Sequence, residues 1–297
     1  MWQALQDFPY FGETSALLWG IAVILFRISG RSVRPLSLNL FKCTLCILLF
    51  IPTVLILGDP LVPAFPIRHY ALLFLSGIIG IGISDTLFFA SLNRIGANLT
   101  AILLCSYSPS VIILATFFLG ERMSLLQLLG VALIISAVFM ISRENEKSLV
   151  SRKNLMVGIV LGLTAMFTMA GSIIIMKPVL DESPVVWATM IRTIGALLAI
   201  SLVIGAHPQR TTLLGEAKLP LNWKAMIPAS IIGSYLAFMA WMGGMKYAQV
   251  SVAAALNQMS TVFIFILGVI FLKERVTPGR LLAMAIAIGG VLLITFL

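Results

Sequence analysis

The chain has 297 residues, of which 60% are hydrophobic and only 10% are charged. A soluble domain carries about 25% charged residues, so this composition excludes an ordinary water-soluble protein and favours a membrane protein, whose outer surface can be apolar. The net charge of +9 does not indicate a nucleic-acid partner, because the Lys and Arg residues lie in short loops between apolar runs and form no basic segment.

A transmembrane helix needs about 20 mostly apolar residues. Ten such runs follow one another along the chain, and they predict an all-α membrane protein with ten transmembrane helices. Most connections are short, so we expect consecutive helices to be antiparallel neighbours. The runs are Gly12–Ile28, Leu36–Leu57, His69–Leu92, Ala97–Leu119, Leu125–Ser142, Leu155–Leu180, Pro184–Gly205, Trp223–Lys246, Val250–Leu272 and Pro278–Leu297.

A polar stretch, Arg143–Asn154, divides the ten runs into five and five. We interpret it as a linker (143–154) between two domains, residues 12–142 and 155–297. The two halves resemble each other in sequence. Gly120-Glu121-Arg122 precedes the last run of the first half, and Lys273-Glu274-Arg275 stands 153 positions later, before the last run of the second half.

The same offset of 153 places Ile232-Gly233 on Ile79-Gly80, and an offset of 150 in the earlier part of each half places Arg192 on Lys42. These matches predict an internal repeat. Because five helices is an odd number, the second half would enter the membrane from the opposite side. The sequence therefore predicts two inverted five-helix repeats, an architecture whose binding site commonly lies near the midplane between the halves.

These features resemble the EamA-like transporters of the drug/metabolite transporter superfamily. The resemblance rests on Leu18-Trp19-Gly20 in the first run, Ser108-Pro109 in the fourth run and the Glu-Arg pair before the last run of each half. It implies a secondary transporter that moves a small metabolite, such as an amino acid, an organic acid or a drug-like compound, by alternating access, and commonly as an exporter. The second half has Thr261-Val262 in place of Pro109, so a break is expected only in the fourth run.

Cytoplasmic loops of membrane proteins usually carry an excess of Lys and Arg. In this chain most of these residues lie in the loops after the first, third, fifth, seventh and ninth runs. The bias predicts that these loops are cytoplasmic and that both termini lie on the other side of the plasma or inner membrane of a bacterium. The expected partners are the lipid bilayer and a small-molecule substrate, and a proton is the candidate coupling ion.

Ionisable residues within the runs are the first candidates for a site, because burying a charge in a membrane costs about 2.5–3.5 kcal/mol on insertion scales. Asp85 lies deep in the third run, where it could bind a proton or a cationic group, or pair with Lys42 or Arg192 as a structural residue. Lys42 and Arg192 occupy equivalent positions of the repeat, so both could face one cavity and hold a carboxylate or phosphate. The alternative is that both side chains snorkel to the membrane surface.

Aromatic and amide side chains complete the predicted substrate-binding set. Trp19, Tyr107, Tyr235 and Trp241 could stack on a substrate, or else belong to the interfacial belts of Trp and Tyr. Asn257 and its neighbour Gln258 lie in the middle of the ninth run, where amides also form hydrogen bonds between helices.

No metal or other cofactor is expected. Cys43, Cys46 and Cys105 lie inside apolar runs, His69 and His207 lie at loops, and no GxxxxGK[ST] motif for a nucleotide is present. Two alternatives to a transporter stay open, a membrane-embedded enzyme and a non-transporting scaffold or receptor. An enzyme would need paired acids, a His cluster or a nucleophile with a base, and a scaffold would need no buried charges at matched positions.

Overall fold

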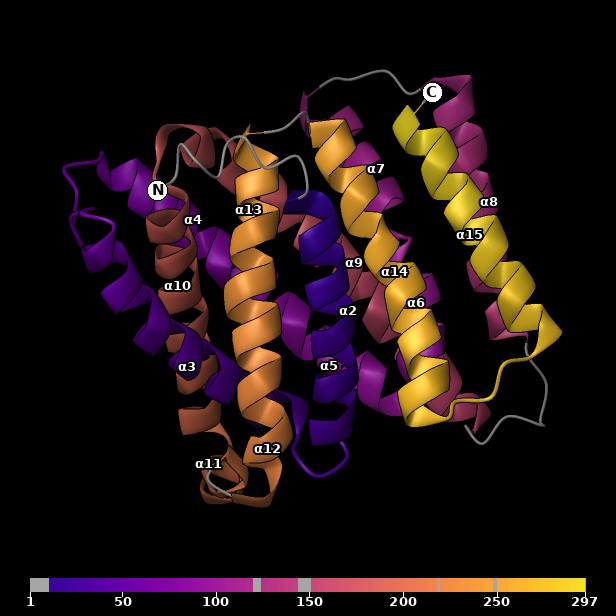
Figure 1. The fold of residues 1–297 in the computed structure, drawn as a ribbon, viewed down its shortest axis with the longest axis horizontal. Coiled ribbons are helices and arrows are strands. Elements are labelled where there is room, and N and C mark those ends of the chain that lie inside the picture. Colours follow the sequence, from indigo (N-terminus) through magenta and orange to yellow (C-terminus); the bar gives the residue numbers. More distant parts are fainter. Residues whose placement is uncertain (1–10, 120–123, 144–150, 218–219, 248–249, 297) are drawn as a thin grey trace.

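The structure is a computed structural model that describes residues 11–119, 124–143, 151–217, 220–247 and 250–296. Side chains are not described at 11–13, 115, 119, 217, 220–222, 245, 247, 250–257 and 295–296. Within the described residues every regular element is a helix (Figure 1). The predicted all-α class is therefore confirmed.

Within the described residues, each of the ten predicted runs is helical over most of its length. The first-half elements are α2 (Phe11–Ser29), α3 (Pro35–Ile56), α4 (Ile67–Gly77), η1 (Ile78–Ser84), α5 (Asp85–Ile95), α6 (Ala97–Leu104), α7 (Tyr107–Leu119) and α8 (Leu125–Ser142). The second-half elements are α9 (Arg152–Glu182), α10 (Val185–Ala206), α11 (Arg210–Ala217), α12 (Pro220–Ala229), η2 (Ser230–Ala237), α13 (Phe238–Tyr247), α14 (Val250–Leu272) and α15 (Pro278–Phe296).

Length and composition qualify seven of the helices within the described residues as membrane spans, and three more apolar helices are shorter. The outer faces of the bundle expose large apolar side chains, as on α8, where Leu129 and Ile135 are more than half exposed. An apolar exterior of this kind suits lipid and would be unstable in water. The number of ten spans stays a prediction.

The third predicted run of each half contains a π-helical segment, η1 in the first half and η2 in the second. A π-helix alters the backbone hydrogen bonds locally and is frequent at functional sites. In η1, the fully buried amide of Asn39 donates to the carbonyl oxygens of Ile81 (2.8 Å) and Gly82 (3.2 Å). Asn39 on α3 thereby satisfies backbone groups that no water would reach inside a membrane.

The fourth predicted run is broken, as expected. Helix α6 ends at Leu104, two residues form a turn, and α7 begins at Tyr107, with Pro109 in its first turn, where a missing N–H is tolerated. The corresponding run of the second half, α14, is continuous from Val250 to Leu272.

Helices of the two halves intermix instead of forming two separate bundles (Figure 1). Helix α2 packs against α14 and against α12, η2 and α13, whereas α9 packs against α6 and α7 and against α4, η1 and α5. Helices α3 and α10 pack against each other toward one side of the bundle in Figure 1, and α8 and α15 form a pair at the opposite edge. The centre of the bundle is therefore built jointly by both halves.

Candidate functional site

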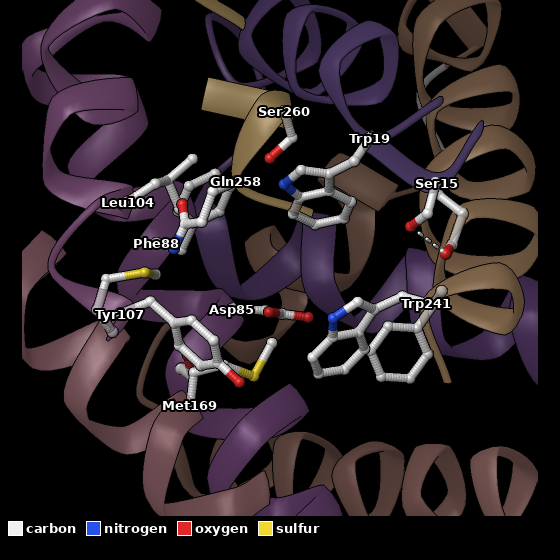
Figure 2. A pocket seen from close by; sticks show the side chains of 14 residues that line it. Ser15, Trp19, Asp85, Phe88, Leu104, Tyr107, Met169, Trp241, Gln258 and Ser260 are labelled. Carbon is white, nitrogen blue, oxygen red and sulfur yellow. Dashed lines mark hydrogen bonds between the residues drawn. The ribbon is translucent and has the colours of Figure 1, made fainter. Parts of the chain in front are cut away.

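A cavity of about 690 Å³, counted with its opening, lies between the two halves. Helices α2, α5, α6 and α7 and the segment η1 supply part of its wall, and α9, α13, α14 and the segment η2 supply the rest (Figure 2). Its lining residues are Ser15, Trp19, Ser84, Asp85, Phe88, Leu104, Tyr107, Met166, Met169, Ala237, Phe238, Trp241, Gln258 and Ser260. A smaller cavity of about 370 Å³ adjoins it, shares Trp19, Asp85, Met169 and Phe238 with it, and extends to Lys42.

The wall between the two cavities carries a buried ion pair. Lys42 Nζ on α3 donates to Asp85 Oδ2, and the two residues are 3% and 8% exposed. Asp85 is the first residue of α5 and directly follows η1. Asn39, which lies about one turn before Lys42 on α3, donates to a carbonyl oxygen of η1. The π-helical segment thus places the carboxylate where it faces both cavities, and the pairing expected as an alternative for Asp85 is present.

Arg192 does not share this environment. Its side chain is fully buried and lines neither cavity. Its guanidinium donates to the thioether sulfurs of Met176 (2.8 Å) and Met242 (3.4 Å) and to Ser172 Oγ (3.4 Å). The expectation that Lys42 and Arg192 both face one cavity is therefore wrong for Arg192, because α9 and α13 enclose its side chain.

Three of the predicted aromatic residues, Trp19, Tyr107 and Trp241, line the larger cavity. Figure 2 shows the indole of Trp241 and the carboxylate of Asp85 pointing toward one another across the cavity. The indole Nε1 of Trp241 is buried and has no hydrogen-bond partner within the described residues. A buried N–H without a partner costs about 1–3 kcal/mol, so this group is ready to donate to a bound molecule.

Tyr235 is not placed at the cavity, and the position of Asn257 is not tested. Tyr235 lies in η2 outside both linings, where its hydroxyl shares a 2.6 Å hydrogen bond with that of Thr53 and its ring packs against Phe50. The side chain of Asn257 lies outside the described residues. Its neighbour Gln258 lines the cavity and donates to Ser108 Oγ (3.0 Å), a hydrogen bond between α14 and α7.

The lining also contains small and apolar residues that sequence reasoning did not select, among them Ser84, Phe88, Met169, Phe238 and Ser260. The repeat offsets are the feature of the sequence from which these lining residues could have been predicted. With an offset of 150 in the first helix of each half and 153 further on, most lining residues form pairs. These pairs are Trp19 with Met169, Ser84 with Ala237, Asp85 with Phe238, Phe88 with Trp241, and Tyr107 with Ser260.

Hydrogen bonds beside the cavity obey the same relation. Ser15 Oγ on α2 donates to the carbonyl of Ala237 (2.9 Å), and Ser84 Oγ donates to the carbonyl of Ala165 on α9 (2.7 Å). With these offsets, Ser15 corresponds to Ala165 and Ser84 corresponds to Ala237. The two hydrogen bonds therefore join equivalent pairs of positions, but the serine that donates lies on α2 in one pair and in η1 in the other. Equivalent helices of the two halves thus meet in equivalent ways.

The residue types at the site suit the binding of a small molecule. A carboxylate, an ammonium, several hydroxyls and an unpartnered indole N–H stand beside aromatic and Met side chains, a set that holds a small molecule with both polar and apolar parts. Within the described residues, no three His, Cys, Asp or Glu side chains come together as metal ligands.

Comparison with known proteins assigns this architecture to a family. The model of the EamA-like transporter family matches residues 10–143 and again residues 156–296. A protein of Archaeoglobus fulgidus described as an uncharacterized transporter is 25% identical over 95% of both chains. A probable amino-acid metabolite efflux pump of Salmonella typhimurium is 27% identical over 64% of this chain and 62% of its own length.

A solved crystal structure has the same fold. It superposes with a TM-score of 0.66 over 95% of this chain and 94% of that chain, at 18% sequence identity. At this identity the likeness concerns the fold alone.

Proposed function

Because the chain belongs to the EamA-like transporter family, we propose that it is a secondary transporter that exports a small metabolite through the central cavity by alternating access. The observation that carries the proposal is the Lys42–Asp85 ion pair, which stands in a cavity lined by repeat-equivalent residues of both halves. A site on the axis that relates two halves can be exposed to each side in turn when the halves rock against each other.

The inverted repeat is part of this proposal, and three observations support it. The packing of α2 on α14 corresponds to the packing of α9 on α6 and α7, and α3 and α10, which are equivalent, pack on each other. The family model matches the chain twice, once in each half. The start of α2 and the end of α15 also lie at the same end of the bundle in Figure 1, as an even number of spans requires.

The substrate that we propose is an amino acid or a related organic acid. A zwitterion can place its ammonium on Asp85 and its carboxylate on a buried cation, while Trp19, Phe88 and Trp241 contact an apolar side chain. The name of the Salmonella relative, which concerns an amino-acid metabolite, agrees with this choice. Asp85 is also our candidate for binding a coupling proton.

We further propose that the protein lies in a bacterial inner membrane with the loops after the first, third, fifth, seventh and ninth runs in the cytoplasm. The excess of Lys and Arg in these loops supports the orientation. A reporter that is active only in the cytoplasm, fused to the C-terminus, tests it, and a strong signal would refute this orientation.

Reconstituted proteoliposomes test the transport function. The purified protein should move at least one radiolabelled compound from a panel of amino acids, organic acids and organic cations, and a pH gradient should drive uptake if a proton is coupled. Asp85→Asn and Trp241→Ala should lower the rate at least about tenfold, whereas Ile135→Ala on the lipid-facing side of α8 should transport like the parent protein. No flux across the whole panel would favour a scaffold or an enzyme instead.

A further inference from the structure

We propose that Arg192 is a second anion-binding position, closed off in this structure by Phe238, and that it receives the carboxylate of the transported molecule. The inference rests on the proposed transport function and goes beyond it, because it assigns a role to a side chain that lines neither cavity. It also requires the substrate to carry an anionic group.

Arg192 is a buried cation that forms no ion pair within the described residues. Its contacts are two weak sulfur acceptors, one hydroxyl and the face of Phe238, whose ring centre lies 5.5 Å from the guanidinium carbon. The Nε of Arg192 has no hydrogen-bond partner in the part of the chain that the structure describes. A buried charge is stable only when it is paired and its hydrogen bonds are made, so this arrangement is incomplete.

The repeat shows which partner is missing. Lys42 corresponds to Arg192, and the two residues that Lys42 contacts on α5, Asp85 and Phe89, correspond to Phe238 and Met242. Arg192 contacts both of those residues. On this side the two cations therefore contact equivalent positions of the repeat, but an aromatic ring occupies the place of the carboxylate beside Arg192.

This difference sets the charge of the interior. Lys42, Asp85 and Arg192 together carry one net positive charge, and a bound monoanion would neutralise it. The guanidinium matches a carboxylate well, because its planar fork can donate two parallel hydrogen bonds.

Phe238 controls the access to this position. Its side chain lines both cavities on one side and covers Arg192 on the other. It is also the first residue after η2, where the helix returns from π to α geometry. Rotation of this ring away from Arg192 would connect the guanidinium to the smaller cavity, where Ser234 contributes a hydroxyl oxygen that has no hydrogen-bond partner within the described residues.

Ligand binding by the purified full-length protein tests the proposal. The probes are L-phenylalanine, 3-phenylpropionate, the amide of each, and chloride, and the measurements are calorimetric affinity and the shift in unfolding temperature. The parent protein should bind at least one carboxylate about 10- to 100-fold more tightly than its amide, as expected for a charge-assisted contact. Arg192→Met should remove this preference, and Arg192→Lys should keep part of it.

A second pair of variants avoids any loss of folding that Arg192→Met could cause. Phe238→Asp gives Arg192 the counter-ion that Lys42 has at the equivalent position, so the variant should fold and should lose the carboxylate preference. An Asn side chain has the same shape as Asp but no charge. The variant Phe238→Asn should therefore bind the carboxylate at least about tenfold more tightly than Phe238→Asp.

The outcomes separate this inference from the transport proposal. Equal affinity for every carboxylate and its amide, an unchanged preference in Arg192→Met or Phe238→Asp, or stabilisation by chloride alone would each overturn the inference. Carboxylate binding that depends on Arg192 in a protein that transports none of the panel would uphold the inference and refute the transport proposal. Transport of a carboxylate at the parental rate by Arg192→Met would refute the inference and uphold the transport proposal.

Discussion

Glu274 caps the helix that begins at Ala97. Its carboxylate accepts hydrogen bonds from the backbone N–H groups of Ala97 (2.7 Å) and Asn98 (2.9 Å), in the first turn of α6. Glu274 lies in the turn between α14 and α15, so this cap joins the second half to the first. Within the Glu-Arg pair of the second half, Glu274 therefore caps a helix of the other half, whereas Glu121-Arg122 lies outside the described residues.

Removing this cap should destabilise the protein. Glu274→Ala leaves two N–H groups of a helix N-terminus without acceptors and removes a negative charge that favours the helix dipole, at a cost of about 1–2 kcal/mol in the free energy of unfolding. Glu274→Gln should cost less, because its amide oxygen still accepts. Denaturation in detergent measures both.

The control for this prediction is Glu182→Ala. The side chain of Glu182 is 67% exposed and lies 3.4 Å from His69, so its loss should change the unfolding free energy by less than about 0.5 kcal/mol. A loss as large as that of Glu274→Ala would show that the cap is not the cause.

The ion pair of Lys42 and Asp85 should show strong coupling. Either Lys42→Met or Asp85→Leu leaves one buried charge without its partner, and such a change costs about 3–5 kcal/mol. The double variant removes both charges and should recover most of that loss. A double-mutant cycle on unfolding free energies measures the coupling, and additive losses would contradict a direct interaction.

Two repeat-equivalent glycines should not tolerate a methyl group. A Cβ on Gly80 would collide with Ser172 Oγ and approach Arg192 Nη2 to 3.1 Å, and a Cβ on Gly233 would meet Ala22 Cβ at 2.5 Å. We expect Gly80→Ala and Gly233→Ala each to cost about 1–3 kcal/mol of stability through overpacking. Gly243→Ala is the matched control, since its Cβ would have no neighbour within 4 Å, and equal losses in all three would reject the packing explanation.

Cysteine labelling should distinguish the cavity from the lipid-facing surface. The three native cysteines are buried, and substituting them by alanine provides a background without thiols. In that background, Met169→Cys on the cavity wall should react with a charged methanethiosulfonate reagent in membrane vesicles. Ile135→Cys, which is 62% exposed on α8, should not react, because a thiol in lipid does not form the reactive thiolate. Rapid labelling of Ile135→Cys would contradict the lipid-facing assignment of α8.

The positions of the helices were predictable because their cause is local. An apolar run of about 20 residues has to satisfy its backbone hydrogen bonds internally in a membrane, so length and composition alone locate the helix. The runs Leu125–Ser142 and Val250–Leu272 coincide with α8 and α14. The π-helical segments were not predicted, since their hydrogen bonds depend on Asn39 and other residues of neighbouring helices.

The candidate site was predictable in part. Asp85 and Lys42 stood out because charges are costly in a membrane, and both line the cavities, as do Trp19, Tyr107 and Trp241. Tyr235 does not, because its direction depends on the altered turn of η2 and on its contact with Thr53.

By itself, the sequence determined that this protein is helical and belongs in a membrane, and it showed that each half carries a cation at an equivalent position. Only the tertiary structure decided that the two cations differ in their surroundings. Lys42 meets Asp85 beside the cavity, whereas Arg192 is enclosed beneath Phe238. The reason is physical, because the cost of a buried charge can be read from residue types, but its partner is supplied by helices far away in the chain.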